Sequence, residues 1–236
     1  MRRALMTLVL LLAWPAAADA ASVKVDECVS ALDAAERSAT FEARVRAARG
    51  SDRMQVRFTL QVRDDASGMR WRKLAPPGFD EWLTSAAGVR KYTYARTIQN
   101  LAAPASYRTV VRFRWLDADG LVLKSSRDTS ASCRQPDLRP DLEALRLEVA
   151  PGPDARTRTY TAVVRNAGRS AAGPFDVALD DAVEPVPGLE PGERRSITFT
   201  APACAPGATQ TLALDPGAAV VERDEGDNVL VTPCQP

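Results

Sequence analysis

Apolar and polar residues alternate along much of this chain, with the period of two that is typical of β-strands buried on one face. The alternation is clearest over residues 41–47, 54–63 and 107–115. Its apolar set is mostly aliphatic or aromatic, and its polar set is rich in arginine. The single helical pattern is a short turn around residues 80–83. The pattern therefore predicts an all-β protein.

A short segment over residues 135–141 interrupts the alternation with two prolines. Segments of this kind are typical of stiff linkers. A second series of alternating residues begins at Leu145. We therefore expect two domains, one of residues 21–135 and one of residues 136–236.

The junction at residues 101–107 resembles the corner that precedes strand F in fibronectin type III and other immunoglobulin-like sandwiches. In that corner a tyrosine six residues after a leucine bonds back to the backbone, and Tyr107 follows Leu101 at this spacing. The resemblance implies a sandwich of this type and carries no information about a ligand. The expected fold is two consecutive immunoglobulin-like β-sandwich domains.

Residues 1–20 have the three parts of a secretory signal peptide. Two arginines precede an apolar run over residues 4–14, and a small-x-small cleavage site follows at residues 18–20. The apolar run is too short to span a bilayer, and no second apolar run follows it. We therefore expect a secreted, extracellular protein that is exported by this signal, with no membrane insertion.

Four cysteines lie near the ends of the two expected domains. Cysteines of an exported protein usually form disulfides, and the chain has no Cys-x-x-Cys spacing of a metal site. Three connectivities are possible for four cysteines. We predict Cys28–Cys133 with Cys204–Cys234, because each bridge then stays within one domain.

The chain contains no histidine. This absence excludes Ser-His and Cys-His nucleophile pairs and histidine-ligated zinc. The adjacent acids Asp64–Asp65 and Asp80–Glu81 suggest a glycosidase carboxylate pair, but neighbours on a strand point to opposite faces and both pairs lie in turn-like sequence. Phosphate-binding loops, dinucleotide fingerprints and nucleophile elbows are also absent. We predict that the protein is not an enzyme and needs no cofactor.

The second domain contains an ordered series of short motifs. They are Pro136-Asp137-Leu138, Val164-Arg165-Asn166-Ala167-Gly168, Ala171 to Phe175, Gly188 to Gly192, Asp215, and Glu222 to Asn228. Together they resemble the bacterial cell-adhesion-related family abbreviated CARDB, over almost all of residues 136–232. Asp227 stands where the family usually has asparagine. The resemblance implies a seven-stranded sandwich in a surface or secreted protein and supplies no catalytic residues.

The last of these motifs concentrates acidic residues, because Glu222, Asp224, Glu225 and Asp227 lie within six residues. Clustered carboxylate oxygens suit Ca²⁺, so Glu222, Asp224 and Asp227 form a candidate calcium site. The spacing differs from that of an EF-hand, since Gly226 falls one position early. The alternative is a hairpin turn in which Asn228 and Asp227 cap the backbone. We expect this structural turn, with no metal.

Opposite net charges mark the two expected domains. Residues 21–135 contain 20 basic and 13 acidic residues, a net charge of +7, whereas residues 136–236 contain 9 and 16, a net charge of −7. Opposed charges of this size steer partners or draw the two domains together. Ordinary solvated strand faces would produce the same counts.

Five arginines of the first domain share the polar phase of two strands that are neighbours in immunoglobulin-like sandwiches. They are Arg57, Arg63, Arg108, Arg112 and Arg114. One outward face would then carry a cationic patch, with Trp82 as an exposed aromatic contact and Trp115 in the core. Such a patch would bind an anionic polymer of the cell envelope or another extracellular protein, and no nucleic acid is expected. The alternative is a solubilising face without a ligand.

These observations favour a secreted bacterial protein of the cell surface. Its expected role is non-enzymatic binding, adhesion or structure, with an anionic envelope polymer as partner. The alternative is an accessory or inhibitory module that binds an extracellular enzyme. A hydrolase that works without histidine is a third hypothesis, and it would require a deep pocket lined by two carboxylates.

Overall fold

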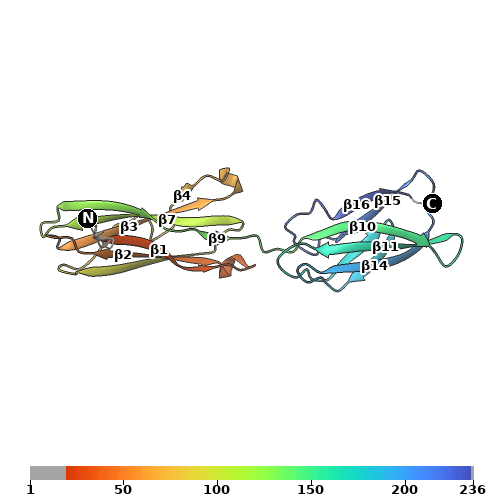
Figure 1. Ribbon diagram of the computed structural model, residues 1–236, viewed down its shortest axis with the longest axis horizontal. Coiled ribbons are helices and arrows are strands. Elements are labelled where there is room, and N and C mark those ends of the chain that lie inside the picture. Colours follow the sequence, from red (N-terminus) through yellow and green to blue (C-terminus); the bar gives the residue numbers. More distant parts are fainter. Residues whose placement is uncertain (1–19, 235–236) are drawn as a thin grey trace, which may run out of the picture.

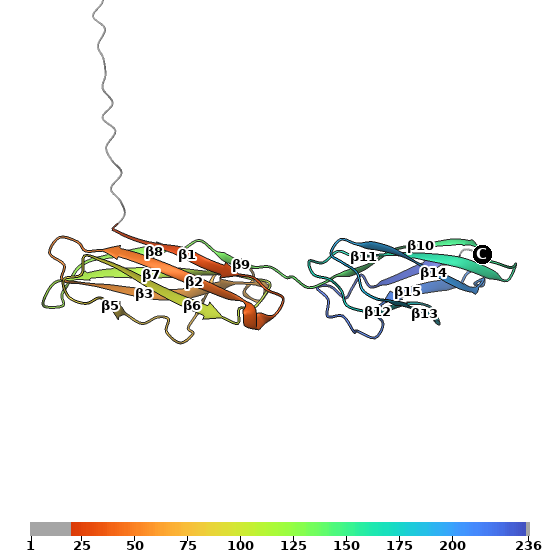
Figure 2. The same cartoon turned by 90° about the horizontal axis from the view of Figure 1, so that it is seen from below.

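The computed structural model describes residues 20–234 and contains strands β1 to β16 with two short 3-10 turns. The strands form two groups, each around its own hydrophobic core, and a single segment joins them (Figures 1 and 2). The prediction of an all-β sandwich fold is confirmed. Nearly all of the expected signal peptide, residues 1–20, lies outside the described residues, so it stays a prediction.

The first group is a sandwich of a three-stranded and a six-stranded antiparallel sheet. The smaller sheet has the order β1 (Ala21–Val29), β2 (Ser38–Arg46) and β6 (Lys91–Gln99). The larger sheet has the order β4 (Arg72–Leu74), β3 (Arg53–Arg63), β7 (Ala105–Leu116) and β8 (Val122–Thr129), while β5 (Leu83–Thr84) pairs with β3 and β9 (Cys133–Gln135) pairs with β7. β3 and β7 are therefore direct neighbours, as the sequence predicts.

The alternation in β3 and β7 separates an inner face from an outer face. Val56 and Phe58 on β3, and Phe113 and Trp115 on β7, are at most 1% exposed. Burial of such side chains contributes about 1.5–3 kcal/mol each, and a slip of one residue would reverse the two faces. Trp115 is a core residue, as predicted, and its indole Nε1 donates a hydrogen bond of 2.7 Å to the carbonyl of Arg46.

Tyr107 forms the corner that its spacing from Leu101 predicts. Its hydroxyl accepts a hydrogen bond of 2.9 Å from the Ala102 N–H and lies 3.2 Å from the Ala102 carbonyl, to which it donates. The tyrosine is 4% exposed. These two hydrogen bonds therefore satisfy both the N–H and the carbonyl of Ala102, just before the chain enters β7.

Residues 80–83 do not form the helical turn that the sequence suggests. Asp80 has a φ of 66°, which lies in the left-handed region and is incompatible with a right-handed helix. Its N–H donates to the carbonyl of Phe58 on β3 at 2.7 Å, and Leu83 already belongs to β5. The two 3-10 turns of the described residues are at Ala34–Glu36 and Asp65–Ser67.

The second group is a seven-stranded sandwich, as the family resemblance implies. Its first sheet has the order β10 (Leu142–Pro151), β11 (Thr157–Asn166) and β14 (Arg194–Pro202). Its second sheet has the order β13 (Ala182–Val186), β12 (Phe175–Leu179), β15 (Thr209–Leu214) and β16 (Val229–Pro233). Tyr160, Phe199 and Leu212 are among the fully buried side chains between these sheets.

Two disulfides are present, Cys28–Cys133 and Cys204–Cys234, as predicted. The first joins β1 to β9 and therefore ties the two sheets of the first sandwich together. The second links the chain after β14 to the chain after β16. Disulfides persist in oxidising compartments, so both are consistent with an extracellular protein. Among the described residues, no helix combines the length and the apolar character needed to cross a membrane.

Candidate binding face

The five arginines singled out from the sequence all lie on the outer face of the six-stranded sheet. Register pairs Arg57 on β3 with Arg112 on β7, while Arg108 and Arg114 lie opposite Gln61 and Gln55. Arg63 is the last residue of β3, and its side chain points to the same side of the sheet as that of Arg57. We call the outward side chains of β3, β7 and β8 the arginine face.

Two tryptophans cover part of the arginine face. Trp71 immediately precedes β4 and Trp82 immediately precedes β5, and both of these strands pair with β3 at the sheet edge. The guanidinium carbon of Arg108 lies 4.0 Å from the centre of the Trp71 ring, and that of Arg63 lies 5.0 Å away. Cation–π contacts at such distances contribute about 0.5–2 kcal/mol.

Trp82 makes the corresponding contacts at the other end of the face. Its ring centre lies 4.1 Å from the guanidinium carbon of Arg114 and 5.9 Å from that of Arg57. The side chain is half-buried. Trp82 is therefore packed against arginines, where the sequence suggested an open aromatic contact.

Arg57 differs from the other four arginines because its charge is neutralised. Its Nε and Nη2 donate to Asp80 Oδ1 at 3.0 and 2.9 Å, and Thr59 donates to the same oxygen. Lys73 binds the other oxygen of Asp80. Chiefly because of the Lys73 bond, and then because of Arg57 and Thr59, the pKa of Asp80 falls to about 2. Arg57 thus anchors the segment before β5 and is not a free cation.

The remaining four arginines make no ion pair within residues 20–234. Arg112 is exposed, and the other three are half-buried. Arg108 donates through Nε to Gln61 at 2.9 Å. Its pKa is lowered, first by desolvation and then by the neighbouring charges of Arg63 and Arg127. The face therefore gathers positive charge that the surrounding residues leave uncompensated.

Arg127 is a member of this face that the sequence did not indicate. It lies on β8, directly opposite Arg112 in the register of β7 and β8, and it is exposed. The alternation in β8 is weak, and a register shift separates Trp115 from Leu116 on β7. Only the strand pairing therefore reveals that Arg127 joins the face.

The acidic residues predicted as a weak calcium site do not lie together as a group of three. Asp224 accepts the N–H of Gly226 at 2.8 Å within its own turn. Glu222 is 2% exposed and accepts the N–H of Leu142 and, at 2.9 Å, the side-chain amide of Asn228. Asp224 and Glu222 therefore cap backbone N–H groups. Asp227 and Asn228, which the turn interpretation made the caps, each have a buried side-chain oxygen without a partner within residues 20–234.

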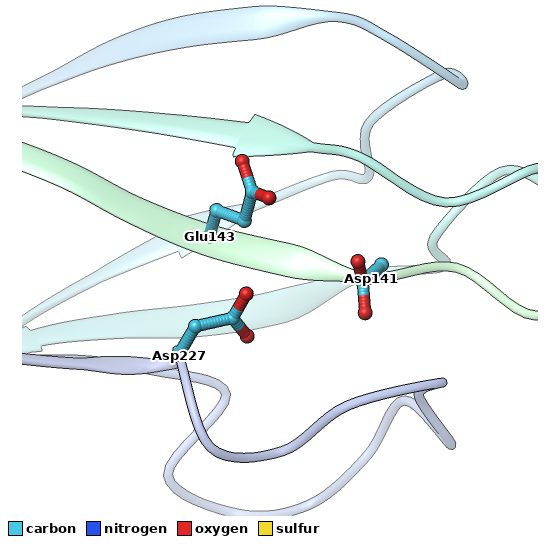
Figure 3. A group of neighbouring side chains, drawn as sticks. All are labelled: Asp141, Glu143 and Asp227. Carbon is cyan, nitrogen blue, oxygen red and sulfur yellow. The ribbon is translucent and has the colours of Figure 1, made fainter.

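A different acidic group forms at the start of β10. Carboxylate oxygens of Asp141, Glu143 and Asp227 lie within 4.8 Å of one another (Figure 3). Asp141 already binds Arg223 and accepts the Asp224 N–H at 3.1 Å. Desolvation, followed by repulsion from nearby carboxylates, raises the pKa of Asp227. We assign no metal to this group, since its most buried member is satisfied by protein donors.

Asn166 shows how the second sandwich closes at this end. It is fully buried, and its side chain makes four hydrogen bonds. Its Oδ1 accepts the N–H groups of Asp141 and Gly168 at 3.1 and 2.9 Å, and its Nδ2 donates to the carbonyls of Ser170 and Leu189 at 2.8 and 3.0 Å. Asn166 therefore ties the start of β10 to the loops after β11 and β13.

Residues 135–232 match the model of the CARDB family. No curated protein matches the chain.

Among solved structures, the chain is similar to one in the crystal structure of the CsuC–CsuE chaperone–tip adhesion subunit pre-assembly complex from archaic chaperone–usher Csu pili of Acinetobacter baumannii. The similarity covers 85% of this chain and 92% of that chain, with 11% sequence identity and a TM-score of 0.25. A likeness this distant adds nothing to the argument about function.

Several motif residues of the CARDB region have structural roles in its turns. A Cβ atom at Gly168 would come within 2.5 Å of the backbone of Pro140, and one at Gly188 would lie 2.6 Å from the carbonyl of Ala172. Gly188 also has a φ of 134°, which favours glycine. Asp215 accepts the N–H groups of two residues in the next turn. Asp215 therefore caps a turn, and the two glycines lie where another backbone segment leaves no room for a side chain.

Glu222 makes the stability of the CARDB region depend on pH. Burial is the main cause that raises its pKa from 4.5 to about 7, and Glu225 and Asp215 add repulsion, while the Leu142 and Asn228 donors oppose the shift. A carboxyl whose pKa is higher in the folded state stabilises that state most when protonated. We expect the free energy of unfolding to rise by up to about 3 kcal/mol as the pH falls from 8 to 5.

Chemical denaturation at several pH values between 5 and 8 measures this effect. Asp80, with a pKa of about 2, stays ionised throughout this range and does not contribute. The variant Glu222→Gln cannot titrate, so its unfolding free energy should change much less across the range. Equal pH dependence in wild type and variant would show that another group is responsible.

Proposed function

We propose that this is a secreted bacterial protein of the cell surface that binds an anionic envelope polymer through its arginine face. The CARDB match supports a surface- or adhesion-related, non-enzymatic role. One observation carries the binding proposal: Arg63, Arg108, Arg112 and Arg114 lie on one outer sheet face and have no acidic partner within residues 20–234. Export by the signal peptide at residues 1–20 is part of the same proposal.

We also propose that residues 21–135 and 136–236 are separate domains. The two hydrophobic cores share no residue, which supports this division. The strand order β4-β3-β7-β8 against β1-β2-β6 and the Tyr107 corner support an immunoglobulin or fibronectin type III type for the first domain.

Charge reversal on the outer face of β7 tests the binding role. The double variant Arg112→Glu with Arg114→Glu should abolish retention of the protein on immobilised anionic cell-wall polymer. Wild-type retention should weaken steeply above physiological salt, because exposed charges more than about 8 Å apart are then screened.

A matched control reverses two arginines on the opposite sheet, Arg44→Glu with Arg46→Glu. Both of these residues are exposed on the outer face of β2. The control should retain wild-type binding. The variant at positions 112 and 114 should stay folded, with a loss of about 0.5–2 kcal/mol from the Arg114–Trp82 contact and within about 0.5 kcal/mol from the exposed Arg112. Unchanged retention of the variant at positions 112 and 114 would leave a solubilising face as the explanation.

A further inference from the structure

The arginine face contains the same arrangement twice. Each tryptophan contacts one arginine of β3 and one of β7. On β3 the two contacting arginines are Arg57 and Arg63, and on β7 they are Arg108 and Arg114, so each strand separates them by six residues. At about 3.3 Å per residue, the two Arg–Trp–Arg units lie about 20 Å apart along the sheet.

The arginines of these units that lack an ion pair within the described residues, Arg63, Arg108 and Arg114, are positioned by neighbouring side chains. All donors of a guanidinium lie in its plane, so a ring stacked on its flat side leaves the edge available for hydrogen bonds. Arg108 is further oriented by Gln61. Side chains fixed in this way lose less entropy on binding.

Two more arginines lie beside the Trp82 unit, because Arg112 is the register partner of Arg57. Arg112 and Arg127 are direct register partners on β7 and β8, and both are exposed. Like charges directly opposite each other destabilise a sheet. The nearest acid along β8, Asp128, accepts the N–H of Val23 instead, at 3.0 Å. A bound anion would therefore relieve this repulsion on the face.

We propose that one linear polyanion lies along β7, with Arg108 and Arg63 at one end and Arg112, Arg127 and Arg114 toward the other end. This inference rests on the proposed function and specifies the ligand of the same face. The guanidinium fork suits carboxylate and phosphate oxygens, so the polymer carries one of these groups. Both tryptophan rings contact arginines, so the proposal assigns recognition to the guanidinium groups that these rings position.

The proposal predicts a threshold in the length of the ligand. A chain shorter than about 20 Å reaches one end of the face, whereas a longer chain engages both ends and gains from the high effective concentration of the second contact. Inorganic polyphosphate and oligogalacturonate, each fractionated by length, are suitable probes for calorimetric titration of the full mature chain. In at least one of the two series, chains longer than about 20 Å should bind tenfold or more tightly than chains shorter than this. This increase should exceed the gradual increase in affinity that each added charge produces within the short chains.

Two variants separate this inference from the proposed function. Arg127→Gln should weaken the binding of long chains about tenfold, and Arg108→Gln should reduce long chains to the affinity of short ones. The control Arg44→Gln with Arg46→Gln removes two exposed charges from the opposite sheet and should bind like wild type.

The possible failures are distinct. If wild type binds neither polymer at any length, both the proposed function and this inference are overturned. If binding is lost in Arg112→Glu with Arg114→Glu but affinity grows only in proportion to charge and Arg127→Gln behaves like the control, the proposed function stands and the linear site is wrong. Binding of an acidic protein in place of either polymer would also overturn the inference.

Discussion

Replacing Cys28 and Cys133 together by alanine is expected to lower the free energy of unfolding of the first sandwich by about 4–5 kcal/mol. The bridge spans 105 residues of chain, and in the chain-entropy account a longer closed loop restricts the unfolded state more strongly. It also connects β1 of one sheet to β9 of the other, so its loss frees the two sheets to separate.

Tryptophan fluorescence during chemical denaturation measures this effect, because Trp71, Trp82 and Trp115 all lie in the first sandwich. The matched control is Cys204→Ala with Cys234→Ala, whose bridge spans 30 residues in the second sandwich. The control should leave the fluorescence transition unchanged if the two sandwiches are independent domains. A shift of less than 1 kcal/mol in the Cys28 and Cys133 variant would show that the sheets hold together without the bridge.

Asn166→Ala is expected to destabilise the second sandwich by about 4 kcal/mol or more. The substitution removes four hydrogen bonds and leaves the N–H groups of Asp141 and Gly168 and the carbonyl of Ser170 without this partner, whereas the Leu189 carbonyl still accepts the Ala172 N–H at 2.9 Å. A buried polar group that loses its partner costs about 1–3 kcal/mol, and water that enters the vacated space recovers part of this.

Far-ultraviolet circular dichroism measures this loss, since the second sandwich contains no tryptophan. Thr198→Ala is a suitable control, because Thr198 is exposed on β14 of the same sandwich and its loss should cost within about 0.5 kcal/mol. The fluorescence transition of the first sandwich should stay at its wild-type position. A loss of about 1 kcal/mol or less would mean that the family asparagine does not hold this end of the sandwich.

The strands and the cores of this protein follow from its sequence. Burial of Val56, Phe58, Phe113 and Trp115 depends on a period of two that is visible in the chain itself, because a strand directs alternate side chains to opposite faces. The pairing of cysteines followed from their positions at domain ends, and the Tyr107 bond followed from a local spacing. These features are local or depend on the order of elements along the chain.

The sequence was less informative about turns. Asp80 and Glu81 suggested a helical start, but Asp80 adopts a left-handed conformation and binds Arg57 across the sheet. The acidic motif suggested that Glu222, Asp224 and Asp227 belong together, whereas Asp227 lies with Asp141 and Glu143. In both cases the deciding partner is distant in sequence, at 23 residues for the Arg57–Asp80 bond.

By itself, the sequence determined that five arginines share one face, because alternation fixes their phase and immunoglobulin-like order makes β3 and β7 neighbours. Only the tertiary structure decided which of them are free to bind. The chain around β4 and β5 brings Asp80 to neutralise Arg57, and it places Trp71 against Arg63 and Arg108 and Trp82 against Arg114. The register of β8 adds Arg127 opposite Arg112. The reason is physical: alternation specifies the direction of a side chain within its own strand, whereas its charge balance depends on residues that other strands place beside it.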